Sequence, residues 1–207
     1  MTDPIFAGVF ADQWSRLPPA LLQHYANRPF SHDRVTVKGT LNIRMGPMMR
    51  VVAPLMAALG MLTPQAGDNI PCTVHFLSEP DSKALVFERW FEFPGGKSYQ
   101  FRSRLVPIRP HEVIEYMPCG IGWRCNYFYN KDKVIMRHRD YVWRLFGRDV
   151  PLLGLGELLF GRGGAYEQAT GDSSFRMRMA TYGGLFMEWM DYSYEGEFMI
   201  TEMALAG

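Results

Sequence analysis

The chain has 207 residues and a net charge of +1, with 47% hydrophobic, 14% aromatic and 21% charged residues. This composition is that of one globular domain, residues 1–207, and the charge gives no electrostatic case for binding nucleic acid. No apolar run reaches the length of a membrane-spanning helix, so we expect no membrane span.

The three cysteines, Cys72, Cys119 and Cys125, have no CxxC spacing, and their odd number argues against a disulfide framework. The N-terminal residues lack the basic and then apolar pattern of a signal peptide. We therefore expect free thiols and a cytoplasmic location.

Residues 4–27 are predicted to form an N-terminal helix in two pieces, because Pro18 and Pro19 suit the first turn of a second piece. Residues 33–44 alternate between apolar and polar side chains. That alternation predicts a half-buried strand, with a bulge at Gly39.

The segment 46–60 begins with a proline at the first helical position and ends at a glycine suited to a C-terminal cap. Apart from Arg50 it is apolar nearly all round, and Pro54 is expected to kink it. A short helix of this kind is usually buried, so we expect it to lie in the core.

From residue 68 onward the pattern changes to short strands separated by turn-forming residues. The predicted strands are 70–77, 84–93, 98–106, 112–117, 121–129, 133–145, 174–181 and 185–200. Residues 150–170 are rich in glycine, with one helical turn around Glu157. The fold class is therefore α+β: a curled, mostly antiparallel sheet of about nine strands, a half-barrel or barrel, wrapped around the buried apolar helix.

One strand places an arginine among large apolar residues. By alternation, one face of this strand carries Leu85, Phe87, Arg89, Phe91 and Phe93. A buried guanidinium needs a partner, either an internal carboxylate such as Glu88 or Glu115, or an anionic group of a ligand. Alternatively, Arg89 extends to the rim, or a one-residue slip turns Glu88 and Trp90 inward.

A second cluster lies in residues 136–145. His138 and Asp140 are two residues apart, so they are predicted neighbours on one strand face, either as an oriented general base or as a surface polar pair. Tyr141 and Trp143 are expected to face the core. Our candidate ligand-binding residues are Arg89, Phe87, Phe91, Tyr141, Trp143, Trp123 and His138.

No nucleotide-binding, nucleophile-elbow or metal-ligand motif is found, so we expect no cofactor and no metal. The catalytic residues, if any, stay unassigned.

The order of several short motifs resembles a bacterial family described as a domain of unknown function, DUF4166. The matching residues run from Trp14 to Phe198 and include Lys38-Gly39-Thr40, Glu88-Arg89, Phe101-Arg102-Ser103, Gly122-Trp123-Arg124, Tyr141-Val142-Trp143-Arg144-Leu145, Glu167 and Tyr194-Glu195-Gly196-Glu197-Phe198. Relatives occur alone or joined to a nucleotide-binding domain, and this chain resembles the stand-alone form. The resemblance implies no activity.

Three functions are open. The first is binding of a hydrophobic or amphipathic small molecule, including an acidic one, in the curled sheet, as the apolar helix and the 14 methionines favour. The second is a cofactor-independent isomerase, cyclase or hydrolase using His138, Asp140, Glu88 or Tyr141. The third is an accessory or protein-interaction domain. A homodimer is left open.

Overall fold

The computed structural model describes residues 2–183 and 191–205 of the chain. The helical segments are α1 (Ala7–Phe10), the 3-10 helix η1 (Ala11–Arg16), α2 (Pro19–His24), α3 (Pro47–Ala58) and α4 (Leu155–Phe160). The strands are β1 (Arg34–Met45), β2 (Gly67–Ser78), β3 (Leu85–Phe93), β4 (Lys97–Arg109), β5 (Glu112–Tyr116), β6 (Ile121–Asn130), β7 (Lys133–Leu145), β8 (Arg148–Pro151), β9 (Arg162–Ala169), β10 (Ser174–Tyr182) and β11 (Tyr192–Ala204).

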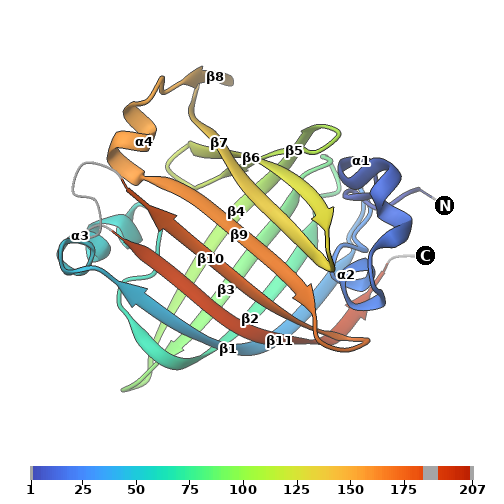
Figure 1. The fold of residues 1–207 in the computed structure, drawn as a ribbon, viewed down its shortest axis with the longest axis horizontal. Helices are drawn as coiled ribbons and strands as arrows, with labels where there is room; N and C mark the ends of the chain where they lie inside the picture. The colour runs from blue at the N-terminus through green and yellow to red at the C-terminus, as the bar shows by residue number, and fades with distance from the viewer. Residues whose placement is uncertain (1, 184–190, 206–207) are drawn as a thin grey trace.

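The strands form one antiparallel sheet that closes on itself. The order is β6-β5-β4-β3-β2-β1-β11-β10-β9-β7-β8, and β6 also pairs with β7. Within the described residues, ten strands thus make a closed barrel, and β8 extends β7 outside the barrel wall (Figure 1). Of the two predicted forms, half-barrel or barrel, the barrel is the one observed.

Alternating side chains fill the barrel interior. On β3 the residues Leu85, Phe87, Arg89, Phe91 and Phe93 are all buried, while Trp90 on the opposite face is 39% exposed. The predicted register of this strand is therefore confirmed, and the alternative with Trp90 inward is wrong.

The N-terminal helices close one end of the barrel (Figure 1). Phe6, Phe10, Leu21 and Tyr25 are almost fully buried. The Phe6 ring stacks on Tyr25 and meets Tyr127 of β6 edge to face, and Phe10 also meets Tyr25 edge to face. The prediction of a helix in two pieces is confirmed, with α2 beginning at a proline.

The prediction that the helix 46–60 is buried within the sheet is wrong. That segment forms α3 at the other end of the barrel, on the outside of its opening (Figure 1). Ala53 is fully buried, but Val51 and Leu55 are 75% and 63% exposed. The apolar sequence reflects two different faces, one toward the barrel and one toward solvent, and Pro54 lies on the exposed side.

Of the eleven strands among the described residues, β8 and β9 were not predicted, because β9 and the end of β8 lie in the glycine-rich stretch 150–170 that resembled a loop. The first part of the predicted strand 185–200 lies outside the described residues, and the rest corresponds to β11. The bulge expected at Gly39 is found three residues earlier, between Thr36 and Val37.

Gly39 has another role. A Cβ atom there would lie 2.0 Å from the carbonyl oxygen of Glu197, so glycine permits the close approach of β1 and β11.

Candidate functional site

Arg89, which was predicted to lie inside the sheet, is buried in the barrel and forms an ion pair with Glu115. Arg89 donates from Nη2 to Oε1 of Glu115 at 3.1 Å and from Nη1 to Oγ of Ser103 at 3.0 Å. Ser103 in turn donates to Glu115 at 2.5 Å. Burial is the largest single effect and would lower the pKa of Arg89, but the charge and hydrogen bond of Glu115, together with Tyr194 and Cys72, outweigh burial and leave the pKa raised. The guanidinium is charged and its charge is balanced within the protein.

A second polar group faces the interior from the N-terminal helices. Tyr25 donates its hydroxyl proton to Oε2 of Glu167 at 2.6 Å, and Nε2 of His24 lies 3.4 Å from Oε1. Burial and the Glu167 charge raise the pKa of Tyr25 well above its usual value, so the phenol keeps its proton. The His24 ring makes no hydrogen bond with the residues that the structure describes.

A small cavity separates these two polar groups. It has a volume of about 40 Å³, and His24, Arg89 and Glu167 lie in its wall among apolar side chains such as Phe87 and Phe198. Such a space holds one or two waters and no organic ligand. The centre of the barrel is therefore a packed apolar core that contains two polar groups, one around Arg89 and one around Glu167.

A more adaptable pocket lies at the end of the barrel that α3 and α4 frame. Its volume is about 70 Å³. The lining is almost entirely apolar and includes Met49, Met56, Met61, Met117, Met179, Ile121, Trp123, Tyr141 and Phe160. Methionine side chains are unbranched and flexible, so they can adjust to an irregular guest. We call this space the methionine pocket.

The helices are fixed over this pocket by specific contacts. At Gly156 of α4, a Cβ atom would lie 2.6 Å from Cβ of Tyr141, so glycine allows α4 to pack directly on β7. The hydroxyl of Tyr99 donates to the carbonyl oxygen of Ala57 at 3.0 Å and holds the C-terminal end of α3.

His138 of β7 lies at the edge of the methionine pocket and connects α4 to the barrel wall. Nε1 of Trp123 donates to Nδ1 of His138 at 3.0 Å, and Nε2 of His138 lies 3.2 Å from Oε1 of Glu157 on α4. An indole nitrogen only donates, so Nδ1 of His138 must be the acceptor, and Nε2 must carry a hydrogen that it donates in a hydrogen bond to the Glu157 carboxylate. Both ring nitrogens are thus engaged, and neither is free to act as a base. Partial burial would raise the pKa of Glu157, but the backbone and His138 hydrogen bonds outweigh it and lower the pKa.

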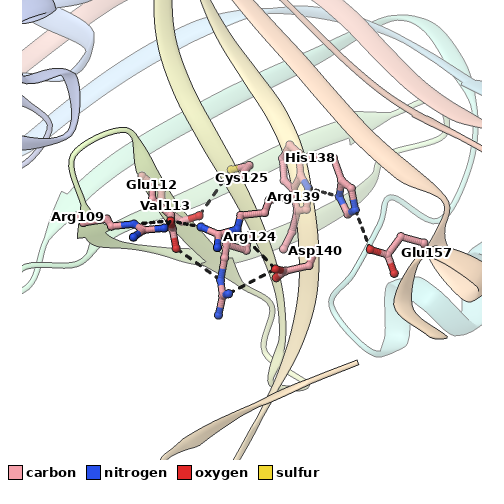
Figure 2. A network of polar contacts seen from close by, with 10 residues as sticks. Arg109, Glu112, Val113, Arg124, Cys125, His138, Arg139, Asp140 and Glu157 are labelled. Carbon is pink, nitrogen blue, oxygen red and sulfur yellow. Dashed lines mark hydrogen bonds and ion pairs between the residues drawn. The ribbon is translucent and has the colours of Figure 1, made fainter. Parts of the chain in front are cut away.

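Outside the barrel, several arginines are held by one carboxylate. Glu112 is buried and contacts Arg109, Arg124 and Arg139, and Arg124 also reaches Asp140 at 3.4 Å (Figure 2). These arginines are compensated within the protein. The arrangement stabilises the β5–β6–β7 surface and offers no free cation.

The predicted site residues fall into three places. Phe87, Arg89 and Phe91 are in the core; Trp123 and Tyr141 line the methionine pocket; His138 lies at its edge. The expected inward position of Trp143 is wrong, because this residue lies near the end of β7, where one edge of the strand still pairs with β6 and the other pairs with β8, and it is 42% exposed.

The predicted His138–Asp140 pair is also wrong. A bulge in β7 pairs Arg124 with Asp140 but Cys125 with His138, so the extra residue Arg139 turns the two side chains to different partners. The candidate acid–base residues do not lie together in one site. The rings of His138 and Tyr141 are in contact, with centroids 4.9 Å apart, but Glu88 accepts a hydrogen bond from Gln100 on the surface.

Sequence reasoning missed His24, Tyr25 and Glu157 as site residues, and it used the number of methionines as a signal for ligand binding without assigning any of them to a site. Glu167 carried a signal only as one of the residues of the family resemblance. The three cysteines are free thiols, and the described residues contain no group of three His, Cys, Asp or Glu side chains that could hold a metal ion. Nor does that part of the chain contain a helix with the length and apolarity needed to cross a membrane.

Comparison with known protein families finds a match. The model of a family described as a domain of unknown function, DUF4166, matches residues 17–198. No curated protein matches the chain.

Proposed function

The chain belongs to the DUF4166 family, and from the geometry of its barrel opening we propose that it binds a small hydrophobic or amphipathic molecule in the methionine pocket. The observation that carries the proposal is the lining itself: five methionines and several aromatic rings gather at one end of a barrel whose other end is closed. Small-molecule sites commonly lie in the mouths of β-barrels and are mainly apolar.

The pocket of about 70 Å³ is smaller than a typical ligand site of roughly 300–1,000 Å³. A ligand chain therefore enters by displacing side chains. The lining supports this, because methionine has three rotatable side-chain bonds and loses little on repacking.

The void deeper in the barrel adjoins the pocket along one strand. Met177 of β10 lines the internal cavity, and Met179, the next residue on the same face, lines the methionine pocket. Rotation of these two side chains would lengthen the pocket toward the core.

The surroundings of the pocket are apolar on the solvent side as well. Val51 and Leu55 of α3, and Leu158 and Leu159 of α4, are 45% or more exposed. Clustered exposed apolar residues mark sites of interaction with apolar partners or ligands. An apolar ligand would meet these exposed apolar side chains on the two helices that frame the pocket before it enters.

A pocket-filling variant tests the proposal. We expect calorimetric titration with 1-octanol to show saturable binding to the wild type, and Met179→Trp, which fills the pocket, to abolish it. Met199→Trp is the matched control, because Met199 is 57% exposed on β11. No binding to the wild type, or equal binding to both variants, would refute the proposal.

A further inference from the structure

A split in the barrel wall lies beside the methionine pocket. β7 pairs with β9 only from Lys133 to Arg137, and the same edge of β7 pairs with β8 only from Val142 to Leu145. The first residues of β9, Arg162 and Gly163, therefore have no partner on β7. The His138–Glu157 contact bridges this split from α4.

An open groove of about 740 Å³ covers the outside of the split. Gly163 lines both this groove and the methionine pocket. A Cβ atom on Gly163 would lie 3.1 Å from the ring of Trp123, which places the wall of the pocket directly behind the glycine. Only backbone and one indole ring separate the two spaces here.

The floor of the groove is made of small residues and its rim of cations. Arg137 pairs with Gly164, which pairs with Ala180, so two small residues lie side by side next to an arginine. Arg162 and Arg178 complete the rim. Small residues between arginines leave room for a group to approach the barrel wall.

The charge of this rim is poorly balanced. Among the described residues, Arg137 and Arg162 make no ion pair within 4.0 Å, and the nearest carboxylate to Arg178 is Glu195 at 3.8 Å. The carboxylate in the groove, Glu157, contacts His138, and the Arg162 charge acts on Glu157 only from beyond ion-pair distance. An excess of guanidinium groups in a concave site favours an anion, which arginine can bind through two parallel hydrogen bonds.

We propose that the groove holds the anionic head of an amphipathic ligand, a carboxylate or a phosphate, whose apolar chain passes Gly163 into the methionine pocket. This rests on the proposed function of that pocket. It assigns the head group to Arg137, Arg162 and Arg178 on the outside, and not to Arg89, whose charge Glu115 already balances.

Calorimetric titrations with ligands that share one chain length test the assignment. The probes are 1-octanol, octanoate, octyl phosphate and inorganic phosphate. We expect at least one of the two anionic amphiphiles to bind the wild type about tenfold or more tightly than 1-octanol does, and inorganic phosphate to bind much more weakly. Octanoate and octyl phosphate together show which head group the groove prefers.

Variants then locate the head group. Arg162→Gln and Arg137→Gln should each remove most of the advantage of the anionic head while leaving 1-octanol affinity unchanged. Arg102 is exposed on the outer face of β4, so Arg102→Gln is the matched control. It should change neither the advantage of the anionic head nor the affinity for 1-octanol. Raised salt should weaken the anionic probes alone.

The results distinguish a failure of the head-group assignment from a failure of the pocket proposal. Binding of 1-octanol with no gain from an anionic head would overturn this assignment and leave the pocket proposal intact. Absence of all binding would overturn both. Inorganic phosphate binding as tightly as octyl phosphate would show an anion site unconnected to the pocket, and an equal loss in Arg102→Gln would remove the groove from the site.

Discussion

Replacing Arg89 by methionine should destabilise the protein strongly, because the buried partner Glu115 stays behind. The two side chains are 11% and 12% exposed, and their charged atoms are 3.1 Å apart. At that separation and an effective dielectric constant of about 20, the attraction is about 5 kcal/mol. Loss of one partner of a buried pair typically costs about 3–5 kcal/mol. We expect Arg89→Met to lower the free energy of unfolding by that amount.

The double variant separates the lost pair from lost packing. Arg89→Met with Glu115→Leu removes both charges, and such replacements of buried pairs are often neutral or stabilising. Most of the stability should therefore return. Arg34→Met is the control, since Arg34 pairs with Glu202 on the surface and exposed pairs contribute about 0–1 kcal/mol.

Circular dichroism during urea unfolding gives the stability of the wild type, Arg89→Met, the double variant and Arg34→Met. An unchanged dependence of the unfolding free energy on urea concentration shows that only stability has changed. An Arg89→Met variant as stable as the wild type would refute the reasoning. So would a double variant no more stable than the single one, because the cost would then lie in packing and not in the uncompensated carboxylate.

Three further predictions address the fold. Burial raises the pKa of Cys72 to about 12, so at pH 8 we expect a thiol reagent such as DTNB to label Cys119 alone in the native protein; rapid labelling of Cys72 would contradict this. Ala53→Asp should destabilise by about 3 kcal/mol, whereas Leu55→Asp should change stability by about 0.5 kcal/mol or less, as urea midpoints will show; equal effects would mean that α3 is oriented differently. Burial raises the pKa of Tyr192 to about 12 from 10.0, so its contribution to stability is complete below pH 10 and is lost as the pH rises toward 12; urea midpoints that do not fall across this range would argue against a buried phenol.

The strand pattern was predictable where alternation is strong. On β3, four large apolar residues around Arg89 identified the inward face, and Glu115 had been one of the two carboxylates considered as its partner. Alternation depends only on the period of two along a strand, so it needs no knowledge of the partner strands.

The sequence was misleading where the environment changes along one element. In α3, Val51 and Ala53 are both apolar, yet one is 75% exposed and the other is fully buried. Composition does not distinguish a helix inside a barrel from one across its opening. In β7, the bulge at Arg139 has no sequence signal of its own, because it is defined by pairing with β6.

The pocket was beyond prediction for a similar reason. Its methionines come from α3, from the loop after α3, from the turn before β6 and from β10, and only the closed barrel brings them together. Likewise, the groove depends on where β7 parts from β9. The strand β9 itself was hidden in a stretch with several glycines.

The central claim, that a small amphipathic molecule occupies the methionine pocket, is tested most directly by NMR of protein labelled with ¹³C at the methionine methyl groups. On titration with octyl phosphate, the methyl signals of Met56, Met117 and Met179 should shift together and saturate with one dissociation constant, because these side chains line the pocket. The signals of Met199 and Met203, exposed on β11, should stay in place. Unmoved pocket signals, or equal shifts at the exposed methionines, would contradict the account.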